Sequence, residues 1–355
     1  MTQPITGNLE KLAIKKAAVW GTAVAAAAGD GLLFRSGGAN RSADVVTDDS
    51  RGLAFSLNGT PGPIKCDPAY EFPLRYIGFD VLLALFMGIA GAPAQQGATI
   101  AYKNIYKWNK SSWGLMATIA KDMINYIEEV PTAKISKIEL SGSVGAEPLQ
   151  LKVTTQGINK EVDSVTNTTA SFLNVTLPSG ADINSVLFSH LVFRMNDQSA
   201  IALAVGDRIY PNKFTLSLER PMKGEYTGEY RTTTTSPQDL IDEPVDDGQP
   251  ILKLTLGFAK HINNTYLAAL GNDTRKKLDI TATGGLIAAP YYYQHLQQFP
   301  HLQMTNNNPA DSKGRIMEDL EFTAHGCTTA PAGMVGITDP LWWTVINTRT
   351  TDPLA

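Results

Sequence analysis

Few residues in this sequence have the types and spacing that catalysis requires. His295 and His301 flank Phe299-Pro300 without a nearby acidic residue, so surface or packing roles are favoured over metal binding. The segment Ser141–Gly145 (SGSVG) resembles a nucleophile elbow, but it lacks the first glycine and lies in a predicted hairpin turn. The sequence has no phosphate-binding loop, dinucleotide-type glycine fingerprint or HExxH motif. We therefore expect no enzymatic activity, no cofactor and no metal site, and an enzyme with an unfamiliar site is the alternative.

The polar segment Arg220–Gly248 is the unusual feature of the second half. It is long for a connection between two strands, and loops of this length are usually functional or disordered. Tyr226 and Tyr230 are candidates to anchor it on a partner surface. Four acidic residues near its end form a cluster, which lacks the alternation and the glycine of a calcium-binding loop, and this favours a solvated loop. These acidic residues are Asp242, Glu243, Asp246 and Asp247.

The composition is that of an ordinary globular protein, with 43% apolar residues, 18% charged residues and a net charge of −4. This mild acidity argues against a protein that grips nucleic acid through its phosphates, but not against one past which nucleic acid slides. The only cysteines, Cys66 and Cys327, suit a reducing cytoplasm, and a single bridge between them stays open. The apolar run Ala17–Gly29 imitates a secretory signal, but a long leader precedes it and Gly21 and Thr22 interrupt it. No stretch has the length of a membrane span, so we expect no membrane insertion.

Alternating apolar and polar residues predict a mainly β protein. In Lys134–Gly157 such alternation on both sides of a Gly- and Ser-rich turn predicts a hairpin within a larger, half-buried sheet. Two helices are predicted: an apolar one at Phe79–Ala90, ended by Gly91 and Pro93, and one at Asn264–Leu270. Met116–Tyr126 fits either a strand or a helix. Other strands are predicted at Leu53–Leu57, Thr99–Tyr106, Leu115–Ala120, Ser171–Leu177, His190–Met195, Phe214–Leu218, Ile251–Phe258, Leu278–Thr283, Tyr291–Gln298, Ile316–Ala324 and Leu341–Asn347.

Several elements recur in one order at a nearly constant offset, which predicts two related β units, 1–162 and 171–355. Coincidental similarity of strands is the alternative. The hairpin at Lys134–Gly157 is then expected to have a counterpart within Arg315–Asn347. The matching segments are Leu82–Leu85 with Leu267–Leu270, Ile138–Ser141 with Leu320–Thr323, and Leu149–Thr155 with Leu341–Asn347.

The order of several segments across the chain resembles the tail tube (major tail) proteins of long-tailed bacteriophages. No single segment is diagnostic, because each is a strand-and-turn pattern. The resemblance also implies that the apolar N-terminal run is kept in the mature protein. The segments are AAVWGTAVAAAAGDGLL, IGFDVLLALFMG, KISKIELSGSVGAEPLQLKVTTQG, GDRIYPNKFTLSLERPM, PVDDGQPILKLTLGF and GMVGITDPLWWTVINTRTTDPL.

This resemblance implies β-sandwich units, each with a flanking α-helix, that close with other chains into a wide β-barrel ring. Stacked rings would form the conduit for phage DNA and tape-measure protein, and tail terminator and tip proteins would be further partners. With two units per chain we expect homotrimeric, pseudo-hexameric rings, with a homohexamer as the alternative. The protein is then expected in the virion tail after synthesis in the host cytoplasm. A β-rich decoration or tail-tip binding module is the competing function.

A channel for DNA must not bind it tightly, so a polar lumen without clustered cations is expected. The outward-alternating residues of the hairpin and of its expected counterpart are the lumen-facing candidates, and the tube exterior is the alternative placement. The candidates are Glu139, Ser141, Gln150, Lys152, Thr154, Asp319, Glu321 and Thr323. The candidates for contact between stacked rings are Tyr226, Tyr230, Asp242 and Glu243.

Overall fold

The computed structural model describes residues 9–47, 55, 59–88, 91–145, 147–179, 184–226, 232–233, 236–237, 240–261, 265–312 and 315–355. The chain is mainly β-structure, as predicted. The strand pairings form an open, branched network, and they do not close into a barrel within the described residues. None of the described helices is long and apolar enough to cross a membrane.

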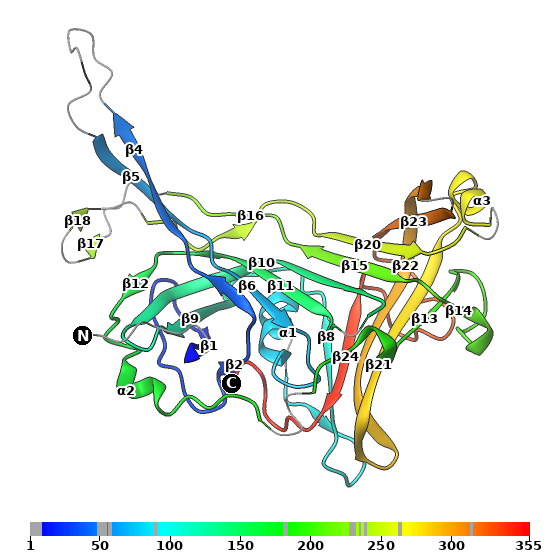
Figure 1. The fold of residues 1–355 in the computed structure, drawn as a ribbon, viewed down its shortest axis with the longest axis horizontal. Coiled ribbons are helices and arrows are strands. Elements are labelled where there is room, and N and C mark those ends of the chain that lie inside the picture. The colour runs from blue at the N-terminus through cyan, green and yellow to red at the C-terminus, as the bar shows by residue number, and fades with distance from the viewer. Residues whose placement is uncertain are drawn as a thin grey trace.

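Eight of the described strands form one antiparallel sheet, here called the long sheet, which runs across the upper part of Figure 1. Its order is β3–β6–β11–β10–β15–β20–β23–β22. Only the second parts of the long strands β10 and β22 belong to it. The bounds are β3 Ser36–Gly38, β6 Ala69–Pro73, β10 Ile127–Ser143, β11 Gln150–Gly157, β15 Lys213–Glu219, β20 Ile251–Phe258, β22 Tyr291–Ser312 and β23 Arg315–Ala324.

Alternation along each strand gives the long sheet one buried face and one polar face. In β15, for example, Phe214, Leu216 and Leu218 are buried, while the residues between them are not. Because successive side chains of a strand point to opposite faces, the apolar set lies on the core side. Apolar residues from the neighbouring strands join the same core cluster.

The first parts of β10 and β22 extend into two outer sheets that lie below and beside the long sheet in Figure 1. The first outer sheet has the order β2–β1–β9–β10–β12, and the second has the order β14–β13–β21–β22–β24–β8–β7. The bounds are β1 Lys11–Ala17, β2 Gly31–Leu32, β7 Ala94–Gln95, β8 Tyr102–Lys107, β9 Met116–Asp122, β12 Glu161–Val162, β13 Leu191–Asp197, β14 Arg208–Ile209, β21 Lys276–Ala288 and β24 Trp342–Asn347.

Two hairpin arms leave the body of the molecule. The first consists of β4 (Arg41–Thr47) and β5 (Gly59–Cys66) and projects away from the body in Figure 1. The second connects β15 to β20, as predicted, and contains two short pairs. These are β16 (Met222–Lys223) with β19 (Val245–Asp246), and β17 (Thr232–Thr233) with β18 (Ser236–Pro237).

Helix α1 (Asp80–Met87) is buried along its whole length, as its apolar sequence predicts. It ends earlier than predicted, because Gly88 adopts a left-handed φ of 78° and its N–H caps the carbonyl of Ala84 at 2.9 Å. The remaining helices are short: α2 Thr169–Phe172, α3 Thr265–Gly271, and the 3₁₀ turns η3 Phe188–His190 and η4 Val205–Asp207.

The pairing order of the second half repeats that of the first. The series β2–β1–β9–β10–β12 corresponds to β14–β13–β21–β22–β24, and β3–β6–β11–β10 corresponds to β15–β20–β23–β22. Helices α1 and α3 take the same place in the order, as predicted from Leu82–Leu85 and Leu267–Leu270. The division into units 1–162 and 171–355 stays a prediction.

The predicted matches between strands are wrong. The counterpart of β10 is β22, whereas the sequence comparison matched Ile138–Ser141 with Leu320–Thr323 of β23. The expected second hairpin within Arg315–Asn347 does not form, because β23 pairs with β20 and β22 while β24 pairs with β22 and β8.

Most other predicted strands are present within a few residues of their expected bounds, and Met116–Tyr126 is resolved as strand β9. The strand predicted at Ser171–Leu177 is wrong. Thr168 instead caps a helical turn, since its Oγ1 accepts a hydrogen bond from the Ser171 N–H at 3.2 Å. The strand predicted at Leu53–Leu57 lies outside the described residues, apart from Phe55.

Candidate functional site

All eight predicted lumen-facing residues lie on the polar face of the long sheet. In one row of facing residues, Glu139 stands between Lys152 on β11 and Ser217 on β15. In the neighbouring row, Glu321 stands opposite Thr255 on β20. The structure thus places residues from both halves on one continuous surface. The other members are Ser141, Gln150, Thr154, Asp319 and Thr323.

Opposite charges alternate across this polar face. The Lys137 Nζ lies 3.2 Å from the Glu139 carboxylate, and the Lys213 Nζ lies 3.0 Å from Asp319. The Lys213 side chain crosses over Gly257 to reach its partner, so a Cβ at Gly257 would lie 2.3 Å from the Lys213 Cε. Glycine at this position of β20 therefore provides the space for the ion pair.

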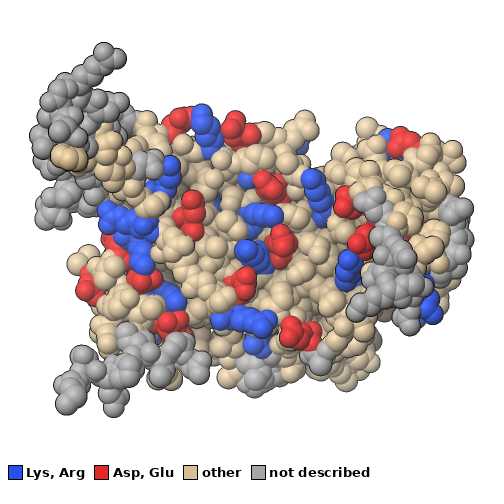
Figure 2. Space-filling model, turned by 45° about the horizontal axis from the view of Figure 1, so that its top comes forward, with Lys and Arg blue, Asp and Glu red and all other residues tan. Residues whose placement is uncertain are grey.

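The same alternation is visible over the surface of the molecule. Figure 2 turns the upper side of Figure 1 toward the viewer, and lysine or arginine and acidic side chains are interspersed across it without a large patch of either sign. Such a surface keeps water bound but offers no cluster of cations that could neutralise DNA phosphates and release the counterions of the DNA.

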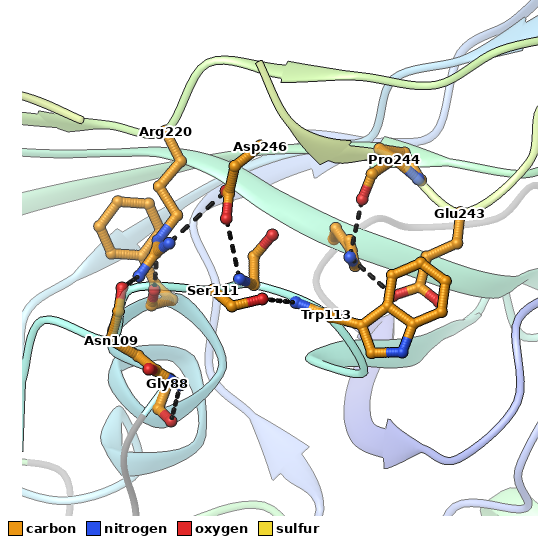
Figure 3. Close-up of polar contacts among 11 residues, drawn as sticks. Gly88, Asn109, Ser111, Trp113, Arg220, Glu243, Pro244 and Asp246 are labelled. Carbon is orange, nitrogen blue, oxygen red and sulfur yellow. Dashed lines mark hydrogen bonds and ion pairs between the residues drawn. The ribbon is translucent and has the colours of Figure 1, made fainter. Parts of the chain in front are cut away.

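A second group of polar residues fixes the arm Arg220–Gly248 to the first half of the chain (Figure 3). The Arg220 side chain is 2% exposed, and its guanidinium donates to the carbonyls of Phe86 at 3.0 Å and Asn109 at 2.6 Å. It also lies 3.5 Å from Asp246 and 4.6 Å from the centroid of the Trp108 ring. Burial lowers the pKa of this guanidinium, while Asp246 opposes that shift.

Lys134 on β10 anchors the same arm. Its side chain is fully buried, and its Nζ lies 2.7 Å from the Glu243 carboxylate and donates to the carbonyl of Pro244 at 2.7 Å. The Glu243 carboxylate also accepts the N–H of Gly114 at 2.9 Å. Burial lowers the pKa of Lys134, and the hydrogen bond that Lys134 donates to Glu243 opposes this shift. The expectation that the acidic cluster is solvated is therefore wrong for Glu243.

The four predicted inter-ring residues have different positions. Glu243 is engaged with Lys134, and the Tyr226 hydroxyl donates to the carbonyl of Ile64 on β5 at 2.9 Å. The Asp242 N–H donates to the carbonyl of Glu225 within the arm. Tyr230 lies outside the described residues. Contact with a neighbouring ring stays a prediction for this segment.

The residues considered for catalysis or metal binding are dispersed. Among the described residues, no three His, Cys, Asp or Glu side chains are grouped so that they could hold a metal ion. Cys66 and Cys327 are free thiols, and burial raises the pKa of Cys66 to about 12. His295 is buried, with its Nε2 donating to the carbonyl of Arg75 at 3.0 Å and its Nδ1 accepting from Trp343 at 3.1 Å.

Sequence reasoning missed the buried cations Lys134 and Arg220. Each contact joins residues more than a hundred positions apart, so periodicity could not reveal it. The available signal was a lysine at position 134, within a run of residues that otherwise suits a buried strand.

The comparison with protein families agrees with this geometry. A family model described as phage tail tube protein matches residues 7–324, which is most of the chain. The chain belongs to the phage tail tube protein family. Curated proteins give no significant match.

Membership in the tail tube family makes the protein a structural component of a phage tail, and it confirms the family predicted from the order of the sequence segments. Proteins of this family assemble with themselves into a tube, so the partners to consider first are further copies of this chain.

Proposed function

We propose that this protein is the major subunit of a tail tube, that its copies close into stacked rings, and that the polar face of the long sheet lines the channel through which DNA is ejected. The observation that carries the proposal is the gathering of all eight candidate residues on one face of one sheet. Its buried face is already occupied by the core of the chain, so the polar face is the one left to meet water and DNA.

Three chains give a ring of plausible size. Each chain supplies eight strands to the long sheet, so three supply twenty-four. With strands ~4.8 Å apart and tilted by ~40°, a closed barrel of that number has a backbone diameter of about 48 Å. Side chains that point into the barrel narrow this diameter, but the remaining channel is still wider than a DNA double helix. Six copies would double the circumference, which favours the homotrimer.

The proposed mechanism is passive. DNA passes without sequence-specific contact because the wall carries acids and lysines close together. Lys137 pairs with Glu139 and Lys213 with Asp319. Lys152 stands opposite Glu71. An unpaired lysine would add affinity for phosphates, and that affinity would fall as salt rises. The further proposed partners are the tape-measure protein inside the tube and the terminator and tip proteins at its ends. We propose that the subunits are synthesised in the host cytoplasm before they assemble.

The test replaces two acids of the polar face by lysine. We expect Glu139→Lys with Glu321→Lys to slow DNA ejection at low salt more than at high salt, because the new cations bind phosphates and salt screens them. The matched control puts the same charge change on two acids that flank the first outer sheet, away from the polar face, Asp122→Lys with Asp163→Lys. Equal ejection rates of the two variants at both salt concentrations would contradict the lumen placement.

Electron microscopy of the purified protein separates this function from the alternative. A tail tube protein gives stacked rings, whereas a decoration or tail-tip module gives isolated particles. A ring reconstruction with six copies of the chain would replace the trimer by a hexamer.

We also propose that the arm Arg220–Gly248 contacts the next ring in the stack. Its base is held on the first half by the contacts of Arg220 and by the ion pair of Glu243 with Lys134. Deleting Tyr226–Asp239 should leave folded chains and rings that no longer stack, as measured by sedimentation and microscopy. Normal tubes from that variant would exclude the arm as a stacking contact.

A further inference from the structure

The chain contains its own example of a joint between two tube units. Residues 137–143 of β10 pair with β15, so Lys137 stands opposite Glu219, Ile138 opposite Leu218 and Leu140 opposite Leu216. The joint is closed at its ends by backbone hydrogen bonds from Arg220 to Ser136 at 2.8 Å and from Val144 to Asn212 at 2.9 Å. The long sheet crosses from the first half to the second at this point.

The correspondence of β10 with β22 holds residue by residue. The pairing of β10 with β11 shifts register between Ile135 and Lys137, and the pairing of β22 with β23 shifts between Met304 and Asn306. At this shift the Ser136 hydroxyl donates to the carbonyl of Thr154 at 3.2 Å, and the Thr305 hydroxyl donates to the carbonyl of Glu321 at 3.2 Å. Ser136 therefore corresponds to Thr305, and Lys137 corresponds to Asn306.

Strands β3 and β4 correspond in the same way to β15. Ser36 stands opposite Glu71 on β6, as Lys213 stands opposite Gly257 on β20, and β2 precedes β3 as β14 precedes β15. Counting from Ser36 and Lys213, Ser42 takes the place of Glu219 and Arg41 takes the place of Leu218.

The counterparts of β10 and β15, which are β22 and the β3–β4 segment, each have an edge without a partner strand among the described residues. On one side of β22, the pairing with β21 ends at Leu302. Beyond that point, residues 303–312 of β22 have no described partner strand on this side and pair only with β23 on the other. On its side away from β6, β3 likewise has no partner strand among the described residues. Such edges invite pairing with another chain.

We propose that this edge of β22 pairs with the β3–β4 edge of a second copy of the chain, in the register of the β10–β15 joint. Asn306 then stands opposite Ser42 of the next copy, and Asn307 opposite its Arg41. The proposal rests on the proposed ring assembly and specifies how neighbouring chains join in it. Repeated around the ring, this joint continues the long sheet from chain to chain.

The joint between chains is more polar than the joint within the chain. Asn307 takes the place of Ile138 and is 7% exposed, its Nδ2 donates to the buried Glu318 carboxylate at 2.9 Å, and its Oδ1 accepts no hydrogen bond within the described part of the chain. The proposed register brings the exposed Arg41 of the next copy opposite this site. A guanidinium is a donor for both the amide oxygen and the carboxylate.

Pro309 takes the place of Leu140 and has no N–H to donate. In the intrachain joint, the two end bonds show that facing residues alternate between hydrogen-bonded and non-hydrogen-bonded pairs. Lys137 with Glu219 is a non-hydrogen-bonded pair. Leu140 with Leu216 is a hydrogen-bonded pair, so the backbone N–H of Leu140 points toward β15. The corresponding joint between chains therefore lacks one backbone hydrogen bond. Proline on an edge strand limits unspecific pairing before assembly.

A disulfide cross-link tests the register. Non-hydrogen-bonded pairs bring their side chains closest, which suits a disulfide. We expect Ser42→Cys with Asn306→Cys to form interchain disulfides in assembled tubes, seen as covalent two-chain and three-chain species on non-reducing gels. Lys137→Cys with Glu219→Cys is the matched control, which should form the equivalent bond within one chain and leave it monomeric on the gel.

Two further cysteine variants exclude chance contact. Ser42→Cys alone should give no covalent species, and Ser42→Cys with Asn307→Cys should give few, because residue 307 lies on the opposite face of its strand.

A charge reversal tests the contact of Arg41 with the next copy. Arg41→Glu should raise the protein concentration needed for assembly at least tenfold, because it places a carboxylate against Glu318.

Each outcome is decisive. Rings in which the 42/306 pair stays uncross-linked while the 137/219 pair closes would overturn the register and leave the proposed function intact. Efficient cross-linking of the 42/307 pair would also overturn the register. Absence of rings from the unmodified protein would overturn the ring assembly itself.

Discussion

The two halves of the chain share one pairing order but differ in what covers their helices. All of α1 is buried, and Arg220 from the second half donates to the carbonyl of Phe86 in its last turn. In α3 only Ala269 is buried. The arms differ as well: the arm of the second half folds back over the first half, whereas the arm β4–β5 of the first half projects away from the body (Figure 1).

The first half is thus covered within the chain, and we expect a neighbouring chain to cover the second half. The arm contacts around Lys134 have no equivalent at the corresponding position, which is Gln303 on β22. If the arm of one unit always covers the unit before it, the arm β4–β5 would cover the second half of the adjacent chain.

The largest expected effect comes from the buried ion pair of the first half. Glu243→Gln leaves Lys134 buried without its counter-charge, and breaking such a pair typically costs about 3 kcal/mol or more in the free energy of unfolding. We expect the double variant Lys134→Met with Glu243→Gln to recover much of this loss, since neither residue of the pair is then charged. Chemical unfolding of the single and double variants measures both values.

The matched control lies in the second half. Gln303→Met at the corresponding position should change the free energy of unfolding by less than about 1 kcal/mol, because Gln303 carries no charge. A cost for Glu243→Gln no greater than that of this control would show that the arm contributes little to the first half.

Much of the fold could be predicted from local patterns. The alternation in β10, β11, β15, β20 and β23 gave the polar face, and the apolar run before Gly88 gave α1. Strand β5 was missed because Gly59, Pro61, Gly62 and Pro63 break the usual strand pattern.

The repeat was found through the wrong strands for a physical reason. Any two half-buried strands with alternating residues resemble each other, so Ile138–Ser141 matched β23 as well as its true counterpart could. The true counterpart in β22 contains Asn306, Asn307 and Pro309, which are residues typical of a strand edge without a partner and not of a core strand. Correspondence became visible only through the pairing order and the shared register shifts.

An intermediate effect is expected on acidification, and it should arise in the second half. All five histidines lie after residue 189, and burial lowers the pKa of both His295 and His301 below 6.5. The unfolded chain then binds a proton near pH 6.5 while the folded chain does not. The stability from His295 is therefore complete above that pH and is lost as pH falls toward the folded pKa, by up to about 1.4 kcal/mol per pH unit. His301 is more exposed, so solvent screening makes its loss smaller.

Urea unfolding at pH 7.0 and pH 5.5 measures this loss. His295→Gln removes one titrating group, so its stability should depend less on pH over this interval, even though the variant is less stable at pH 7.0. An unchanged pH dependence would mean that His295 does not contribute, and His301→Gln then serves as the second comparison.

The smallest effect is expected from the exposed ion pair of the second half. Lys213 and Asp319 have side chains that are 48% and 41% exposed, and exposed pairs contribute about 0–1 kcal/mol. Lys213→Met should therefore change the free energy of unfolding by less than about 1 kcal/mol, far less than Glu243→Gln. A larger loss would mean that the polar face stabilises the chain itself. A small loss together with altered DNA ejection would assign the charges of this face to the channel, because Asp319 would then stand without its cation in the wall.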